Sequence, residues 1–269
     1  MIPFFLPVGD GFRFCIFYEA QIHPAKGAVL YVPPFAEEMN KSRRMAARQA
    51  RGLAAAGYCV LQMDLLGCGD SSGVFQDATW DLWLNDLLHA CEHLKSRSDA
   101  PLTLWGLRAG CLLAAQAAAG LSESVNFIFW QPVLSGKQHW LQFMRLKMAS
   151  ELVSGSKKGG ADEIRQALGA GQSVDIAGYS IAPGLVQGLE STELLPPAGK
   201  CSQVVWIELS SRSDATLSPV AQKRVQAWEE VGYRMHTMVV TGPAFWQTTE
   251  IEDAPVLLLK TLDALDSGS

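Results

Sequence analysis

The chain has 269 residues, of which 48% are hydrophobic and 18% charged, so it can bury the core of one large α/β domain or of one such domain with an inserted cap. The formal net charge of −5 and the isoelectric point near 5.6 argue against nucleic acid as a default partner. No apolar run reaches the ~18–20 residues that span a bilayer, and residues 1–7 lack the basic region and cleavage site of a signal peptide.

The cysteines are scattered along the chain. They form no CxxC pair, and their spacing to the histidines is not that of metal ligands, so we expect reduced, mostly buried thiols in a cytoplasmic protein. We expect neither a metal nor another cofactor. The six cysteines are Cys15, Cys59, Cys68, Cys91, Cys111 and Cys201.

The predicted elements begin with a hairpin over residues 4–20, in which two strand-forming segments flank the turn Gly9-Asp10-Gly11. Continuous apolar runs then predict buried strands at 28–32, 59–63, 102–105, 125–130, 204–209 and 235–241. Helical patterns lie between them, at 41–56, 79–96, from about 109, 219–231 and 255–265. This alternation predicts a mostly parallel central sheet flanked by helices.

The alternation breaks at about residue 135. Residues 154–160 form a flexible linker rich in glycine and serine, and 161–198 predict two short helical stretches and a short strand. A helix before the linker can present one apolar face, formed by Trp140, Phe143, Met144, Met148 and Leu152. We therefore predict a core built from 1–134 and 201–269, with 135–200 as an inserted cap or lid.

The segment Gly106-Leu107-Arg108-Ala109-Gly110 follows a buried strand and precedes a small-residue helix. This is the frame of the nucleophile elbow, G-x-S-x-G, in which the turn is too tight for side chains two positions either side of the central residue. The central side chain therefore stands exposed at the carboxyl edge of the sheet. Here that central residue is Arg108.

With this frame, the chain resembles the α/β-hydrolase superfamily over nearly its whole length. Residues 64–71 match the family's D-x-x-G-x-G-x-S loop, residues 130–133 match the end of its sixth strand, and Asp214 falls where its acid follows the seventh strand. More narrowly, residues 31–44 and 245–252 look like the exosortase A system-associated hydrolases of the second type. That resemblance implies a bacterial exopolysaccharide and surface-protein export system, without establishing a reaction.

The catalytic pattern of the superfamily fails at two positions. A serine hydrolase needs a hydroxyl, an imidazole that takes its proton, and a carboxylate that orients the imidazole. Arg108 stays protonated at any working pH and cannot be a nucleophile. The resemblance places the histidine near Phe245 and Trp246, where the sequence has none, so only Asp214 remains as a candidate catalytic residue.

Other residues are weak substitutes. We expect Cys111 and Cys68 to be structural thiols and Ser71 and Ser72 to form loop hydrogen bonds. His89 and His93 have a metal-compatible i,i+4 spacing, but without nearby acids or cysteines a surface or packed role is favoured. His139, in the predicted cap, is the one histidine retained as a remote candidate base.

Arg108 could instead receive an anion or be neutralised internally. The resemblance implies an oxyanion hole formed by the N–H groups of Ala109 and Phe35, and a guanidinium beside such donors suits a carboxylate or phosphate. Buried arginine needs a partner, and Glu37, Glu38 and Asp214 are expected at the same edge. An ion pair and a ligand site are compatible if the pair is exchanged on binding.

Two further features surround this edge of the sheet. The basic residues Lys41, Arg43 and Arg44 open the predicted helix, where they oppose its dipole, and they could be surface charges or anion contacts. Aromatic residues near the cap hinge could pack the cap onto the core or form an apolar wall for an acyl chain. These are Trp130, Trp140 and Phe143, with Phe245 and Trp246 placed opposite them by the resemblance.

Three hypotheses remain open. The first is a degenerate hydrolase that binds an anionic, partly apolar metabolite or lipid-linked ligand through Arg108, Ala109, Phe35, Glu37, Glu38 and Trp246. The second is an active ester or thioester hydrolase or acyltransferase with a non-standard nucleophile or water, using Asp214, Glu37 or Glu38 as base. The third is a protein-interaction partner of the export machinery.

Overall fold

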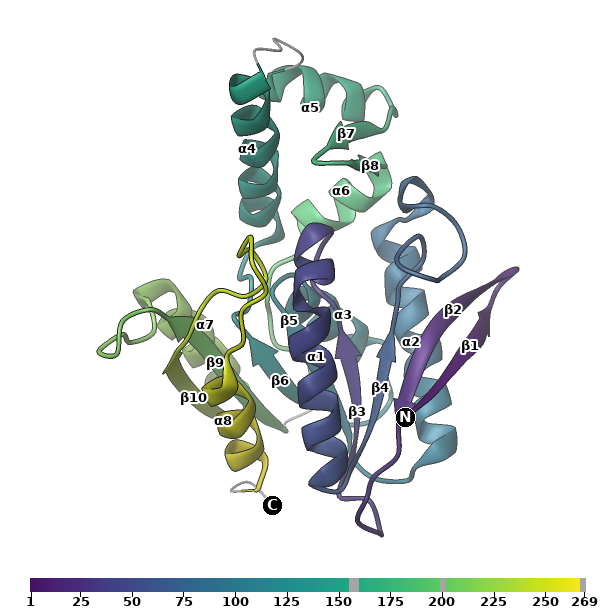
Figure 1. The fold of residues 1–269 in the computed structure, drawn as a ribbon, viewed down its shortest axis with the longest axis vertical. Helices are drawn as coiled ribbons and strands as arrows, with labels where there is room; N and C mark the ends of the chain where they lie inside the picture. Colours follow the sequence, from purple (N-terminus) through teal and green to yellow (C-terminus); the bar gives the residue numbers. More distant parts are fainter. Residues whose placement is uncertain (155–159, 199–201, 267–269) are drawn as a thin grey trace.

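The computed structural model describes residues 1–154, 160–198 and 202–266, and it contains one eight-stranded sheet of order β1-β2-β4-β3-β5-β6-β9-β10 (Figure 1). The pairs β1–β2 and β2–β4 are antiparallel, and every other neighbouring pair is parallel. The strands are β1 (Ile2–Val8), β2 (Gly11–Tyr18), β3 (Gly27–Val32), β4 (Tyr58–Met63), β5 (Leu102–Leu107), β6 (Asn126–Trp130), β9 (Gln203–Ser210) and β10 (Arg234–Thr241). The predicted N-terminal hairpin and mostly parallel sheet are both confirmed.

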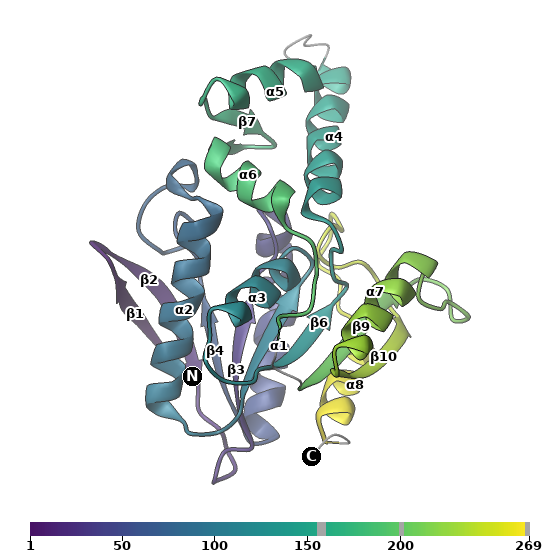
Figure 2. The same ribbon diagram turned by 180° about the vertical axis from the view of Figure 1, so that it is seen from behind.

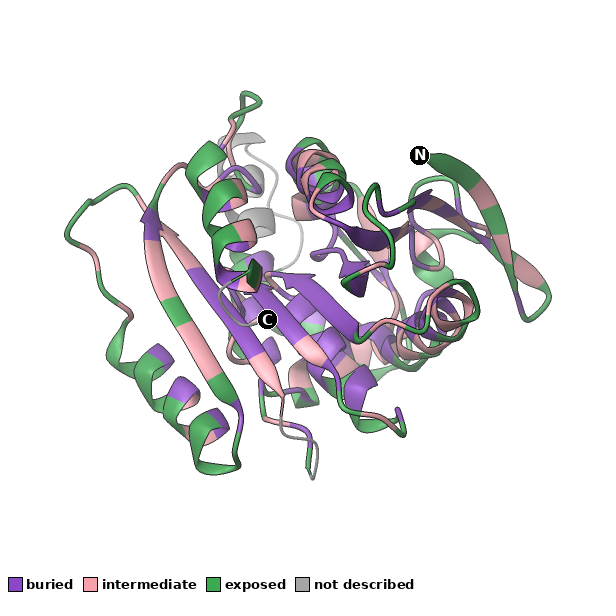
Figure 3. Ribbon diagram, turned by 90° about the horizontal axis from the view of Figure 1, so that it is seen from below, coloured by how far each residue is buried: buried purple, intermediate pink, exposed green. Residues whose placement is uncertain are grey.

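Helices cover both faces of the sheet (Figures 1 and 2). On one face lie α1 (Glu37–Ala55) and α8 (Pro255–Asp266), which contact each other. On the other face lie α2 (Trp80–Arg97), preceded by the short helix η1 (Phe75–Asp77), then α3 (Gly110–Ala119) and α7 (Pro219–Glu230). The inner strands are buried along most of their length, as Figure 3 shows, which explains their continuous apolar runs.

The segment predicted as a cap lies beyond the carboxyl ends of the parallel strands (Figure 1). It comprises α4 (Gly136–Ser154), α5 (Ala161–Gly169), the hairpin β7 (Val174–Ile176) and β8 (Tyr179–Ile181), and α6 (Pro183–Ser191). The sequence predicted one short strand here, and the structure has two, because Ala177 and Gly178, both with positive φ, form a turn between them. The linker residues 155–159, the side chains of Met148 and Leu152, and Cys201 lie outside the described residues.

The start of α1 corrects one prediction. The helix begins at Glu37 and not at Lys41, because Ala36 turns the chain with φ 51° and ψ −125°. Two acidic residues therefore occupy its first turn, where they favour the helix dipole. The predicted clash of the basic residues with that dipole was wrong, since they lie further along the helix and two of them, Arg43 and Arg44, pair with acids on other segments.

Candidate functional site

The turn between β5 and α3 has the tight geometry that its glycines predict. Arg108 adopts a left-handed φ of 55° at the apex. A Cβ on Gly106 would lie 2.7 Å from the Cα of Cys111, and one on Gly110 would lie 2.6 Å from the carbonyl oxygen of Pro33. Only glycine fits at either position without a shift of backbone, so the turn fixes Arg108 at the carboxyl edge of the sheet.

Arg108 pairs with Glu38, one of the three acids predicted as its partner. Its Nε donates to Glu38 Oε1 at 3.2 Å, and its guanidinium carbon lies 5.5 Å from the ring centroid of Trp246. The two side chains of the pair are only 16% and 19% exposed. Burial raises the pKa of the Glu38 carboxyl, and the nearby Arg108 charge lowers it by a smaller amount.

His139, from the first turn of α4, stands beside this pair. Its Nε2 lies 4.0 Å from Glu38 Oε2, which is too long for a hydrogen bond. Burial, followed by the Arg108 charge, lowers the pKa of His139 to about 3, so the ring is neutral at physiological pH. Among the described residues, neither His139 ring nitrogen nor Glu38 Oε2 has a hydrogen-bond partner, although all three atoms are buried.

Two backbone N–H groups belong to the loop after β3 and to the turn that carries Arg108. The carbonyl oxygens of Val32 and Pro33 lie directly against Gly110, so the loop after β3 packs on the turn that carries Arg108. In the part of the chain that the structure describes, neither the N–H of Phe35 nor that of Ala109 has a hydrogen-bond partner. Both are donors at the start of a helix, where the dipole favours an anion.

These groups surround one cavity of about 210 Å³, which we call the Arg108 cavity. It lies between the start of α1, the start of α4 and the loop after β10. Its aromatic wall consists of Phe35, Phe143 and Trp246. Its polar and charged lining includes Glu37, Glu38, Lys41, Arg108, His139 and Gln142. The predicted ligand-binding residues are therefore brought together, with Ala109 next to Arg108 in the turn.

Asp214, the predicted catalytic acid, is not part of this group. Its side chain is 72% exposed and its carboxylate accepts from Arg212 Nε and Nη2 at 3.1 and 2.9 Å. The two hydrogen bonds from Arg212 are the main cause that lowers the pKa of Asp214. Asp214 does not line the Arg108 cavity, nor the neighbouring cavity that also borders Arg108. Asp214 lies on the loop after β9, at the expected edge of the sheet, but it pairs with Arg212 and not with Arg108.

The other candidate nucleophiles and ligands have structural roles. Cys111 is fully buried, and burial raises the pKa of the Cys68 thiol to about 12, as expected for structural thiols. Ser71 donates to the carbonyl of Asp64 and accepts from the N–H of Phe14. His93 stacks on the ring of Phe4. No cluster of three or more metal-ligating side chains occurs among the described residues.

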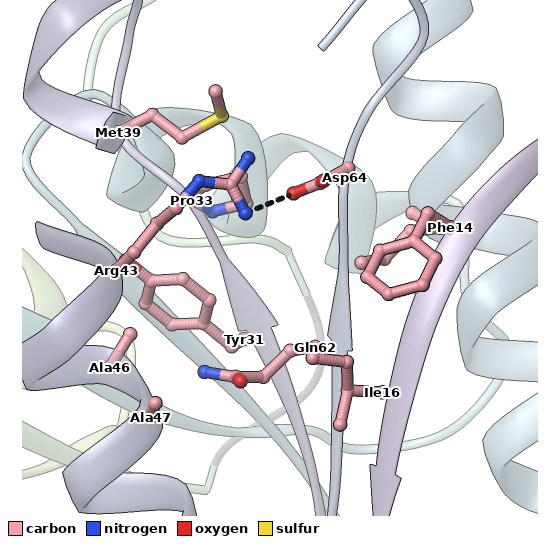
Figure 4. Close-up of a pocket in the computed structure, with 11 residues that line it drawn as sticks. Phe14, Ile16, Tyr31, Pro33, Met39, Arg43, Ala46, Ala47, Gln62 and Asp64 are labelled. Atoms are coloured by element: carbon pink, nitrogen blue, oxygen red, sulfur yellow. Dashed lines mark ion pairs between the residues drawn. The ribbon is translucent and has the colours of Figure 1, made fainter. Parts of the chain in front are cut away.

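A second cavity of about 220 Å³ lies between α1 and the strands β2 and β4 (Figure 4). Most of its lining is apolar, and its charged groups are already paired, since Arg43 Nη1 lies 3.0 Å from Asp64 Oδ1. Gln62 is also engaged, because its Oε1 accepts from the hydroxyl of Tyr18. This cavity therefore offers less unmet hydrogen-bonding capacity than the Arg108 cavity.

Sequence reasoning missed two lining residues, Gln142 and Gln247, and Gln142 could have been found. It follows His139 by three residues on α4, so the two side chains share one face of the helix. That spacing was a usable signal once His139 had been considered. Nothing in the sequence alone indicated that this face would point at Arg108.

No family model and no curated protein matches the chain. Solved structures match it along nearly its whole length, and the three described next are distant in sequence. Est1E from Butyrivibrio proteoclasticus, in a structure with ferulic acid bound, has a TM-score of 0.68 and 14% identity over 98% of both chains. A soluble variant of monoglyceride lipase from Saccharomyces cerevisiae has a TM-score of 0.65 and 14% identity over 100% of this chain and 96% of the lipase.

Alpha/beta hydrolase domain-containing protein 10 from mouse has a TM-score of 0.60 and 13% identity over 100% of both chains. Together with the sheet order, these likenesses show that the chain has the α/β-hydrolase fold. At such low identity they leave the reaction open. Within the described ranges, no helix is both long enough and apolar enough to cross a membrane.

Proposed function

We propose that this protein is a degenerate member of the α/β-hydrolase fold class that binds an anionic, partly apolar small molecule against Arg108. The observation that carries the proposal is the set of donors at the Arg108 cavity that have no hydrogen-bond partner among the described residues: the terminal nitrogens of Arg108 and the buried N–H of the neutral His139 ring. Leaving the buried histidine donor unpaired costs ~1–3 kcal/mol, so an anion that accepts from it gains affinity. The permanent charge of Arg108 selects an anion, and the aromatic wall accommodates an apolar group.

The setting that we propose is the cytoplasmic side of a bacterial exopolysaccharide and exosortase-associated system. Its support is the resemblance of residues 31–44 and 245–252 to the exosortase A system-associated hydrolases. Both segments contribute to the Arg108 cavity, through Phe35 and Lys41 from the first and Trp246 from the second. The residues that carry the narrow resemblance thus border the site that we propose for the ligand.

Binding of simple anions tests the proposal. We expect hexanoate or butyl phosphate to raise the melting temperature of the wild-type protein, and Arg108→Met to abolish that rise. Asp214→Ala is the matched control, because it removes an exposed charge outside the cavity and should keep the response. If no anion gives a shift that depends on Arg108, the proposal fails.

The same variants separate the alternatives. Turnover of p-nitrophenyl butyrate or of an acyl thioester that Asp214→Ala or Glu38→Gln abolishes would instead support an active hydrolase or acyltransferase with an unusual nucleophile or water. A protein partner captured equally by the wild type and Arg108→Met, in the absence of any Arg108-dependent anion binding, would favour an interaction role. Among the described residues, no specific contact favours either alternative over anion binding.

A further inference from the structure

Two cavities meet at Arg108. A further cavity of about 420 Å³, which we call the side cavity, adjoins the Arg108 cavity and lies between the start of α4 and the helix α7. Arg108, His139 and Gln142 line both cavities and separate them. The arginine therefore stands at the middle of an elongated space, with room for ligand atoms on either side of it.

The two halves of this space differ in chemistry. The Arg108 cavity has the aromatic wall described above. The side cavity has an aliphatic part, formed by Pro132, Val133, Leu134 and Val220, and a polar part with Ser135 and Gln138. An ion pair lies along the polar part, in which Arg224 Nη2 donates to Glu193 Oε2 at 2.8 Å. A ligand that fills both halves would place an apolar substituent on one side of Arg108 and a polar one on the other.

The charges that line the two cavities sum to zero. The positive side chains are Lys41, Arg108 and Arg224, and the negative ones are Glu37, Glu38 and Glu193. A lining without excess positive charge suits a single negative charge better than the charge of about −1.5 to −2 on a phosphate monoester. A carboxylate is also a monoanion, but in an unbranched acid it ends the chain and carries one substituent, so such an acid fills only one of the two cavities.

Arg108 can hold such a group while it stays paired with Glu38. The ion pair uses Nε, and neither terminal nitrogen of the guanidinium has a hydrogen-bond partner within the described part of the chain. Two terminal N–H groups match two oxygens of a phosphate. The neutral ring of His139, 6% exposed and with both nitrogens unsatisfied, adds a donor that could meet an ester oxygen.

We propose that the ligand is a monoanionic phosphodiester, seated with its phosphate on Arg108, its apolar substituent in the Arg108 cavity and its polar substituent in the side cavity. This inference rests on the proposed anion site at Arg108 and specifies the class of anion. It explains why a permanent charge stands between two cavities of unlike polarity, where a terminal anion would need only one of them.

Calorimetric titration with three probes tests the inference. We expect butyl 2-hydroxyethyl phosphate, a diester, to bind the wild type about tenfold more tightly than either butyl phosphate or hexanoate, because only the diester occupies both cavities. Gln138→Trp places a bulky ring in the side cavity alone and should remove this preference by weakening the diester. Lys137→Trp is the matched control, since it adds the same ring to the neighbouring position, which lines a different cavity.

The outcomes distinguish this inference from the function on which it rests. Binding of all three probes with equal affinity, lost in Arg108→Met, would overturn the diester while the anion site stands. A diester preference unchanged in Gln138→Trp would also overturn it, because the side cavity would then play no part. If no probe binds in an Arg108-dependent way, the proposed function itself fails.

Discussion

Removing the His139 imidazole should reduce the loss of unfolding free energy that the protein suffers between pH 7 and pH 5. The folded protein holds the pKa of His139 at about 3, below the ordinary value of 6.5. A lowered pKa of this kind stabilises the folded state above the unfolded-state pKa, and the stabilisation is lost as the pH falls toward the folded-state pKa. Between pH 7 and pH 5 the unfolded histidine takes up most of a proton and the folded one does not, which costs about 2 kcal/mol.

The result depends little on the folded-state value, as long as the pKa of His139 stays well below 5. We expect the loss of unfolding free energy between pH 7 and pH 5, measured by urea titration, to be smaller by about 2 kcal/mol in His139→Gln than in the wild type. In melting temperature this is roughly 4–8 °C. Glu38 acts in the opposite sense, because its raised pKa gives stability that is lost as the pH rises. Since the wild type and His139→Gln both contain Glu38, the comparison between them isolates the effect of His139.

His89→Gln is the control, since it removes a histidine from α2, outside this cluster. Equal losses of stability in the wild type and His139→Gln would refute the reasoning, because the imidazole would then take up its proton in both states. Such a result would mean that water reaches the ring, or that it pairs with Glu38 as an imidazolium.

Three further predictions concern the same region. Gly110→Ala should lower the unfolding free energy by about 1–3 kcal/mol or more, because the new Cβ meets backbone carbonyl oxygens. Gly169→Ala is the control, since its Cβ would meet nothing within 4 Å, and urea titration of both variants should show the loss only in Gly110→Ala. A double-mutant cycle with Arg108→Met and Glu38→Gln should give a coupling free energy of about 0.5–3 kcal/mol, and simple additivity would contradict the buried ion pair. Arg108→Met should also raise the pKa of His139, followed by NMR titration of the imidazole protons, since the Arg108 charge is one cause that lowers it; an unchanged pKa would leave burial as the whole cause.

The sequence predicted the scaffold of the site better than its chemistry. The position of Arg108 follows from two local requirements, a strand that runs into Gly106 and a glycine four residues later, and both act over a few residues. The partner of Arg108 could be narrowed only to three acids. Glu38 was selected by the turn at Ala36, whose positive φ starts α1 early, and residue type alone does not signal such a φ at an alanine.

The positions of His139 and Asp214 relative to Arg108 could not be predicted from the sequence. His139 was considered remote because its helix belongs to an inserted segment, and the placement of that segment over the sheet depends on contacts between distant parts of the chain. Asp214 was assigned from its order after a strand, but the loop that carries it has room to turn outward and pair with Arg212. Position along the chain predicts which edge of the sheet a loop leaves, and it does not fix where a side chain on that loop points.

On the proposed function, Arg108, Glu38 and His139 act as one cluster. A permanent positive charge at the apex stabilises a carboxylate beside it and disfavours a second positive charge on the neighbouring imidazole. Burial, followed by the Arg108 charge, keeps His139 neutral, with a pKa too low to hold the proton that a general base must accept near neutral pH. The cluster thus offers hydrogen-bond donors, a compensated charge and an adjoining cavity, beside a histidine of low basicity. These features suit the anion binding that we propose.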